Sequence, residues 1–556
     1  MLFTNNKFRR VIVKKIAISL LCITMLASSL LLGGCSSKQA ENSQSEEKEA
    51  KKELVLALGS EPDGGFDPIN GWGRYGSPLF QSTLLKRDQD MNIINDLATG
   101  YEVSEDGLTW TVSIREDAKF SDGQPLTSED VVFTFEKLME SSSTVDLTFV
   151  DSVTSKSDYS LEFKLKSPRS TFISNLIATG IVPKKSYTSE YYQNPIGSGP
   201  LVLVQWDKGQ QIIVKPNENY YGQKPNFDKI TFLFLEEDAA FAAAKAGQLD
   251  MTAIPPSYAS QKIEGMKLTE VSSVDNRGIM FPTVKSGEAD ADSNPIGNDV
   301  TSDLAIRQAI NVALDRQAIV DGVLEGYGTK AYSICDKMPW WNEETVTTDN
   351  DVDLAKKILA DGGWIDADGD GILEKDNIKA EFNLVYPSGD QLRQSLAMVV
   401  ADMVKPIGIN IVIEAKTWDE IEAVLHKDAI LMGWGSQDPL EMYNVYSSKM
   451  KGVEWYNPGY YDNQKVDEYM EKALQARSEE EANEYWKKAQ WDGETGLSGK
   501  GDVPWVWLVN RSHLYLVNDK LDIGKQQIQP HGHGWPLTSN IEQCKWIDSL
   551  KGQYYE

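Results

Sequence analysis

The sequence predicts an α/β protein built as two lobes that close on each other like a clamp. At 556 residues the chain is too long for one hydrophobic core. Strand and helix patterns alternate between residues 380 and 432, which is typical of a parallel sheet with right-handed crossovers. Apolar strands at 504–509 and 513–517 are expected to return to the first lobe, so that more than one segment joins the lobes.

The first 34 residues are predicted to be a secretory signal of the bacterial lipoprotein type. Five basic residues precede an uncharged apolar stretch at 16–32, and small residues then lead to Cys35. The alternative, a membrane-spanning anchor, needs about 20 apolar residues, and this stretch is shorter. Cleavage before Cys35 leaves a diacylated cysteine, and two acyl chains suffice for stable anchoring. Residues 36–52 are rich in Glu, Lys, Ser and Gln and are predicted to form a disordered tether.

The composition is that of an acidic, exported globular protein with few cysteines. The formal net charge is −28, and removal of the basic signal makes the mature chain more acidic still. Such a charge argues against nucleic-acid binding and repels an anionic lipid surface, which leaves the lipid anchor to hold the protein at the membrane. Cys22 leaves with the signal, and the spacing of Cys335 and Cys544 leaves open whether they pair.

Elements of the first lobe follow from apolar alternation and turn residues. Residues 54–58 form a strand of the buried type, and residues 59–78 are a loop rich in Gly and Pro. Residues 201–206 and 211–214 flank Asp-Lys-Gly and predict a hairpin. A third strand at 230–235, an alanine-rich helix at 238–246 and the Gly247 cap complete this run.

From residue 298 the pattern changes to that of a second α/β lobe. Strands are predicted at 380–386, 409–414 and 429–432. Helices are predicted at 306–314, 316–324, 390–404, 418–426, 462–476 and 478–490.

Three ordered blocks of sequence carry a resemblance to a known family. The first holds Gly197-Ser198-Gly199-Pro200, then Asn217, Tyr220, Gly222, Lys224 and Pro225, then Ala243, Gly247, Leu249 and Asp250. The other two blocks are residues 115–135 and 307–316. From Leu54 to the C-terminus the chain resembles the extracytoplasmic solute-binding proteins of ABC importers, family 5, the peptide- and nickel-type receptors. The resemblance implies a type II, periplasmic-binding-protein-like clamp with an inserted subdomain, a monomer that delivers ligand to permease subunits, and no enzymatic activity.

These observations together divide the chain into seven segments. They are the signal (1–34), the lipidated cysteine and tether (35–53), lobe I (54–85), its inserted subdomain (86–194), lobe I again (195–282), lobe II (283–503) and a return to lobe I (504–556).

The loop at 71–78 offers the first candidate ligand-binding residues. Trp72 and Tyr75 supply stacking surface, and Arg74 supplies a guanidinium that can hold a carboxylate with paired donors. The alternative is a loop that packs its own aromatic side chains over the core. The family resemblance places this first long loop at the border of the cleft.

The loop at 433–439 follows a strand and offers the second set. Trp434 matches the aromatic wall that the resemblance implies. Peptide-binding relatives hold the ligand ammonium with an Asp here, but Gln437 stands at about that place and Asp438 comes next. This departure weakens a simple oligopeptide interpretation.

The late histidines offer a metal-binding hypothesis. His531 and His533 lie in a Gly/Pro-rich loop, and His513 is a weaker third candidate. A His-x-His pair alone is weak evidence for a metal site, and histidines that cap backbone groups are the alternative. Nickel-binding members of the family bind chelated Ni²⁺ in the cleft with help from histidine. An acidic loop at 366–377 resembles a calcium loop but lacks its closing Glu, and a structural turn is favoured.

The favoured ligand is therefore a nickel chelate or related metallophore, carried as cargo, with no resident cofactor expected. A short peptide is the alternative. The sequence contains no G-x-S-x-G, H-E-x-x-H or phosphate-loop motif, so an extracytoplasmic hydrolase is a remote third hypothesis.

The lipoprotein hypothesis predicts the effect of one substitution. Cys35→Ser removes the lipid attachment point, so the protein should leave the membrane fraction while it keeps its fold. Fractionation with mass spectrometry of the mature N-terminus checks this. A wild-type chain that keeps its uncleaved N-terminus without lipid on Cys35 would contradict it.

Overall fold

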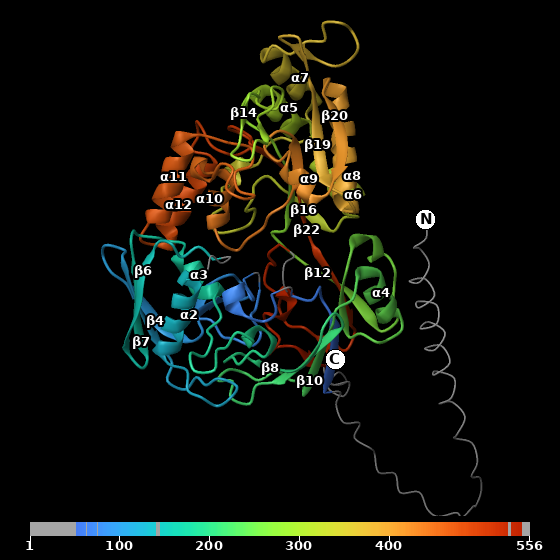
Figure 1. Cartoon of the computed structure of the whole chain (residues 1–556). Coiled ribbons are helices and arrows are strands. Elements are labelled where there is room, and N and C mark those ends of the chain that lie inside the picture. Colours follow the sequence, from blue (N-terminus) through green and yellow to red (C-terminus); the bar gives the residue numbers. More distant parts are fainter. Residues whose placement is uncertain (1–51, 63, 75, 141–144, 532–534, 548–556) are drawn as a thin grey trace, which may run out of the picture. The chain divides into compact units, whose positions relative to one another are not determined.

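The computed structural model describes residues 52–547, except 63, 75, 141–144 and 532–534. The predicted signal, Cys35 and most of the tether lie outside the described residues. Strand pairing within the described part gives two large sheets, one four-stranded sheet and four two-stranded sheets; Figure 1 shows the arrangement of the main elements. Among the described helices, none combines the length and apolar character needed to cross a membrane.

Lobe I is built on a mixed seven-stranded sheet. Its β8–β9 pair is the predicted hairpin. One face packs under α4 (Glu237–Lys245) through Ala57, Leu514 and Leu516, and the other face forms a separate core. In spatial order the strands are β12 (Met266–Val271), β23 (His513–Asn518), β11 (Met251–Ile254), β1 (Glu53–Ala57), β10 (Lys229–Leu233), β9 (Gln211–Pro216) and β8 (Leu201–Asp207).

The inserted subdomain has a four-stranded antiparallel sheet and its own core. Trp110, Val112 and Ile114 share the buried face, as their alternation predicts. Helices α2 (Ser128–Glu140) and α3 (Phe172–Ala178) contribute buried side chains to the same core. The strands are β4 (Ala98–Val103), β5 (Thr109–Ile114), β7 (Ser160–Leu165) and β6 (Val150–Ser157), with the hairpin β2 (Leu85–Arg87) and β3 (Ile93–Asn95) alongside.

Lobe II is built on a six-stranded sheet with helices on both faces. The predicted parallel strands are present, since β19 pairs in parallel with β20 and β21. Neighbouring residues alternate between the two cores, as Leu384 and Val385 do, because successive side chains of a strand point to opposite faces. The strands are β16 (Gly328–Lys330), β22 (Trp505–Arg511), β13 (Asn276–Met280), β21 (Ala429–Met432), β19 (Glu381–Pro387) and β20 (Asn410–Lys416).

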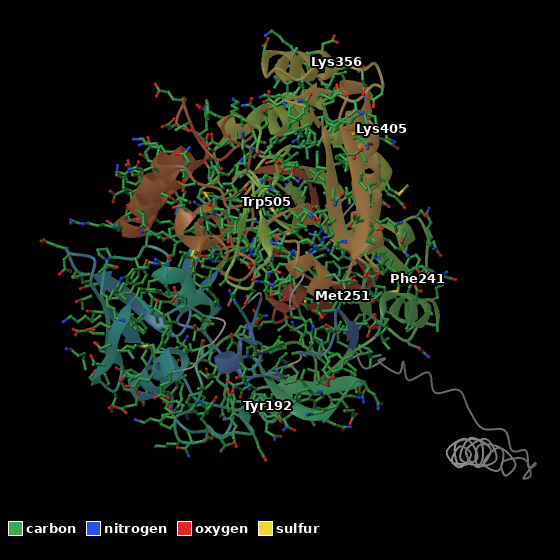
Figure 2. The ribbon with its side chains drawn as sticks, turned by 45° about the horizontal axis from the view of Figure 1, so that its top comes forward. Tyr192, Phe241, Met251, Lys356, Lys405 and Trp505 are labelled. Carbon is green, nitrogen blue, oxygen red and sulfur yellow. The ribbon has the colours of Figure 1, made fainter. Side chains whose placement is uncertain are left out.

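The helices of lobe II form two groups, one on each face of this sheet (Figure 1). Figure 2 shows Trp505 inside the lobe, whereas Lys356 and Lys405 lie at its exposed surface. One group is α5 (Leu304–Ala313), α6 (Arg316–Val323), α7 (Val352–Asp361) and α8 (Gln391–Val404). The other is α9 (Trp418–Glu422), α10 (Leu440–Tyr446), α11 (Gln464–Gln475) and α12 (Glu479–Gln490).

The structure corrects the predicted position of two strands. Residues 504–509 were expected in lobe I, but β22 pairs with β13 and β16 in the lobe II sheet. β13 also belongs to lobe II, although 195–282 was assigned to lobe I. An all-apolar strand fits the interior of either sheet, so the local pattern does not specify its partner. The chain therefore crosses between the sheets at 272–275 and again at Ser512.

The two cysteines left open by the sequence do not pair. Cys335 and Cys544 are both free and buried, Cys335 in the core of lobe II and Cys544 in that of lobe I. Burial raises the pKa of both thiols, that of Cys544 to about 12. Both are therefore unreactive core residues.

The acidic loop at 366–377 forms a turn whose carboxylates are occupied. Asp366 accepts backbone N–H groups of Gly369 and Gly371. Oxygens of Asp366, Asp368 and Glu374 converge within 4.8 Å, and the ammonium of Lys379 pairs with this cluster. The Lys379 ammonium therefore provides the positive charge that balances the carboxylates of this loop.

Candidate functional site

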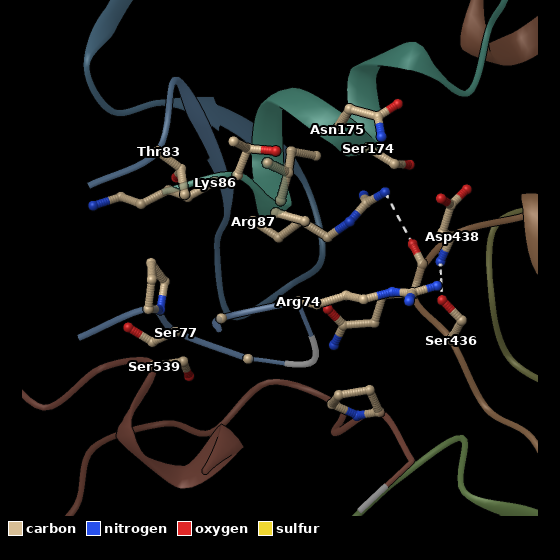
Figure 3. A pocket seen from close by; sticks show the side chains of 18 of the residues that line it. Arg74, Ser77, Thr83, Lys86, Arg87, Ser174, Asn175, Ser436, Asp438 and Ser539 are labelled. Carbon is tan, nitrogen blue, oxygen red and sulfur yellow. Dashed lines mark hydrogen bonds between the residues drawn. The ribbon is translucent and has the colours of Figure 1, made fainter. Parts of the chain in front are cut away.

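A cavity of about 360 Å³ lies between the two lobes, and residues of both line it. Lobe I contributes the loop at 73–83, β2 and α3, and lobe II contributes the loop at 433–441. The C-terminal segment adds Gln527, Pro530 and His531. We call this the central cavity, and Figure 3 shows side chains that line it. Its volume is in the range of small-molecule binding sites.

The glycine-rich turn at 197–200 positions the lobe I wall. A Cβ on Gly197 would lie 1.9 Å from the Phe80 carbonyl oxygen, so only glycine fits there. The Gly199 N–H donates to the same oxygen at 2.8 Å, and the Ser82 hydroxyl donates to the Ser198 carbonyl at 3.0 Å. The turn thus fixes residues 81–83, whose side chains line the cavity.

The lobe II wall lies directly against the first crossing segment. The loop at 433–439 leaves the carboxyl end of β21. A Cβ on Gly433 would lie 2.3 Å from the Asn276 carbonyl oxygen, and one on Gly435 2.2 Å from that of Val274. Gly435 also has a φ of +142°, which other residues rarely adopt. Glycine at both positions therefore lets the loop at 433–439 contact the backbone of 274–276, where the chain crosses between the lobes.

Charged side chains of both signs line the central cavity. Lobe I contributes Arg74, Lys86, Arg87, Asp96, Asp146 and Glu542, and lobe II contributes Asp438 and Glu441. Arg74 and Arg87 extend from lobe I toward the loop that holds Asp438 (Figure 3). Arg87 Nη2 donates to the Gln437 carbonyl at 3.3 Å. Burial raises the pKa of Asp438, and it raises that of Glu441 to about 7 although Arg74 opposes the shift. Guanidinium groups face carboxyl groups across the cavity, which suits a ligand with charges of both signs.

A buried carboxylate, Asp275, lies where the chain crosses between the lobes. Its side chain is 2% exposed. Arg277 Nη1 and His531 Nδ1 lie 2.5 and 2.6 Å from Oδ1. His513 Nε2 and Arg511 Nε lie 3.2 and 3.7 Å from Oδ2. Burial alone would raise the pKa of Asp275, but Arg277, His531 and His513 hold it well below its usual range.

The contact with Asp275 defines the chemistry of His531. A nitrogen 2.6 Å from a carboxylate oxygen must carry a proton, so Nδ1 is the donor. In the neutral imidazole the lone pair is then on Nε2. Metal-binding histidines typically donate their other N–H to a carboxylate in this way. The backbone N–H of His531 donates to the Gly435 carbonyl at 2.7 Å, which holds this residue against the loop at 433–439.

The structure brings most of the predicted ligand-binding residues together. Arg74, Trp434, Gln437, Asp438 and His531 all line the central cavity. The Gln437 amide donates to the Ile528 carbonyl at 2.7 Å, and the Trp434 ring stacks with Tyr456 at 6.1 Å. Tyr75 and His533 lie outside the described residues.

Among the described predicted residues, Trp72 and His513 do not line the cavity. The Trp72 ring packs against Phe66 and Trp535 in the lobe I core, because its indole N–H is held by the Pro78 carbonyl at 2.7 Å. This is the alternative that the sequence left open for that loop. His513 lies in β23 and contacts Asp275 and Gln529.

Seven charged residues of this region were not predicted from the sequence: Asp275, and Lys86, Arg87, Asp96, Asp146, Glu441 and Glu542, which line the cavity. No motif marks them. Asp275 had one signal, because a charged Asp-Asn-Arg run directly precedes the apolar end of β13. Such a run next to a buried strand requires partners from elsewhere in the chain.

Comparison with known proteins gives the family. The profile of the bacterial extracellular solute-binding proteins, family 5 Middle, matches residues 92–456. Protein XP55 of Streptomyces lividans is 31% identical over 490 residues, which cover 85% of this chain and 86% of that protein. The chain belongs to the family 5 extracellular solute-binding proteins. Its family is one of substrate receptors of ABC importers, which bind their solutes and do not transform them.

Two solved structures of the family are similar to this family 5 protein. NikZ from Campylobacter jejuni, in complex with Ni(L-His), has a TM-score of 0.74 and 26% identity, covering 89% of this chain and 99% of that one. AppA from Bacillus subtilis, in complex with a nonapeptide, has a TM-score of 0.67 and 26% identity, covering 90% and 99%. The type II clamp fold is thereby confirmed, and the two relatives bind different kinds of ligand.

The raised pKa of Glu441 predicts a pH-dependent stability in this family 5 protein. Because the pKa of Glu441 is higher in the folded chain than in the unfolded chain, its protonated form stabilises the fold. This contribution is complete below about pH 4.5 and is lost as the pH rises through about 7. Glu441→Gln does not titrate, so the variant should gain stability relative to wild type by roughly 2–3 kcal/mol between pH 5 and 8. Urea denaturation at both pH values measures this. Asp336, whose pKa is raised to about 6, titrates in both proteins, so its contribution cancels in the stability difference between wild type and variant. A difference that stays constant with pH would contradict the prediction.

Proposed function

We propose that this chain is a lipid-anchored receptor of an ABC importer that captures a small nickel chelate in the central cavity. The observation that carries the proposal is the Asp275–His531 pair, which directs His531 Nε2 for metal binding at a cavity-lining position. Imidazole nitrogen suits Ni²⁺, and an amino-acid or related chelator fills the other positions. Arg74 holds a carboxylate of the chelator, and Trp434 packs against its body.

Capture depends on closure of the two lobes. The cavity walls come from both lobes, so a ligand gains all its contacts only when the lobes meet. Differential affinity for the closed state is what shifts the population toward it. The closed receptor then meets the permease, while the diacylated Cys35 and the acidic tether keep it near the outer face of the membrane.

A short peptide is the second candidate. Asp438 and Glu441 form an acidic wall that could hold an ammonium group, and AppA is a relative with a peptide ligand. The central cavity is near the lower end of the usual range for small-ligand sites, which suits a short peptide better than a long one.

One substitution distinguishes the two ligands. His531→Ala removes the proposed metal ligand, so affinity for nickel–histidine should fall about tenfold or more while affinity for tri-alanine stays unchanged. Isothermal titration calorimetry with both compounds measures this. Affinity for nickel–histidine should also weaken in acid, because nitrogen ligands must be deprotonated to bind a metal.

His426→Ala is the matched control, since His426 is buried beside Pro458 and does not line the central cavity among the described residues. It should leave both affinities unchanged. If the wild-type protein binds the peptide tightly and does not bind nickel–histidine, the nickel proposal is wrong and the peptide proposal replaces it.

A further inference from the structure

A second cavity of about 130 Å³ adjoins the central cavity and shares Arg87 and Ser174 with it. We call it the side cavity. The inserted subdomain forms one wall with Trp110 and Arg169, and lobe II forms the other with Trp340, Arg477 and Trp486. Like the central cavity, it is enclosed only when the two lobes meet.

Among the charged side chains that line the side cavity, basic ones outnumber acidic ones. Arg87, Arg169 and Arg477 line it, against a single acid, Glu479. Within the described part of the chain none of the three forms an ion pair, although acidic residues outnumber basic ones by 83 to 55. Arg87 donates to two carbonyl oxygens, those of Met91 and Gln437. Burial lowers the pKa of Arg87 even though Glu479 and Asp438 oppose the shift.

Three residues that line the side cavity carry a hydrogen-bond donor without an acceptor. Among the described residues, Trp110 Nε1, Trp486 Nε1 and Arg169 Nε have no hydrogen-bond partner. Trp110 is 6% exposed and Trp486 is fully buried. These three nitrogens can only donate, and protein covers each of them in this structure, so they are unsatisfied donors on residues of the cavity wall and not contacts offered to a ligand. Buried unsatisfied donors are rare in native proteins, which makes three around one cavity a feature to explain.

A direct contact between the lobes lies beside this cavity. The Ser170 N–H donates to the Leu474 carbonyl at 2.7 Å, and the Ser170 hydroxyl donates to that of Ala473 at 2.7 Å. Ser170 belongs to the inserted subdomain and the two carbonyls end α11 of lobe II. An anion bound here therefore interacts fully only with the closed receptor, which favours closure.

We propose that the side cavity binds a carboxylate that projects from the ligand seated in the central cavity. A carboxylate is planar, carries two acceptor oxygens and matches paired guanidinium donors. The indole walls accept the carbon chain that bears it. The transported ligand is then a chelator with an uncoordinated carboxylate, or an acidic peptide if the second candidate holds. This inference rests on the proposed receptor function.

Matched ligands test the side cavity. The dipeptides His-Glu and His-Gln, each loaded with one equivalent of Ni²⁺, share their metal-binding groups and differ in one carboxylate. Wild-type protein should bind the His-Glu complex about tenfold more tightly or better, as expected for a charge-assisted contact. Arg169→Gln should bring this ratio close to one. Ala-Ala-Glu and Ala-Ala-Gln, which also differ in one carboxylate, repeat the comparison without metal and test the peptide alternative.

Arg115→Gln is the control, because Arg115 pairs with Asp117 away from both cavities, and it should keep the wild-type ratio. Circular dichroism confirms that the Arg169 variant is folded. Equal affinities of wild type for the Glu and Gln ligands, or an unchanged affinity ratio in Arg169→Gln, would overturn the proposal that the side cavity binds a carboxylate. The proposed receptor function would still stand. If nickel–histidine, tri-alanine and all four matched ligands fail to bind, the proposed function and this inference both fall.

Discussion

The buried carboxylate of Asp275 is the interaction on which the arrangement of the site depends. A charge that is 2% exposed costs several kcal/mol unless it is paired and hydrogen-bonded. Its partners come from three separate segments: Arg277 begins lobe II, Arg511 and His513 flank the second crossing, and His531 lines the cavity. The ion pairs and hydrogen bonds of this one carboxylate thus hold together the two segments that cross between the lobes and His531, the proposed metal ligand.

The same region joins the segment that crosses between the lobes to the loop at 433–439. Gly433 and Gly435 let that loop lie on the backbone of 274–276, and the Gly435 carbonyl accepts the N–H of His531. In the proposed function, a ligand that draws the loop and the imidazole together therefore acts on a segment that crosses between the lobes. In that function, capture and closure depend on one set of contacts, and charged groups of both signs in the cavity orient the ligand.

Much of the fold could be predicted because local patterns determine it. The hairpin, the parallel strands of lobe II and the long helices follow from periodicity and turn residues. The placement of β22 and β13 in the lobe II sheet could not be predicted, because the sequence of an apolar strand such as β22 does not specify which strands it pairs with. The site was predictable where loops carried aromatic or charged residues, as at Arg74 and Trp434. Asp275 and Arg87 escaped prediction because their roles arise only when distant segments meet.

The central claim is that Asp275 couples the ligand site to the hinge. Small-angle X-ray scattering of wild type and Asp275→Asn, each with and without nickel–histidine, tests it most directly. Asparagine keeps the shape of the side chain but removes the charge that orients His531 and pairs with Arg277. Nickel–histidine should reduce the radius of gyration of wild type but leave that of the folded Asp275→Asn variant unchanged. Equal contraction of both proteins would contradict it.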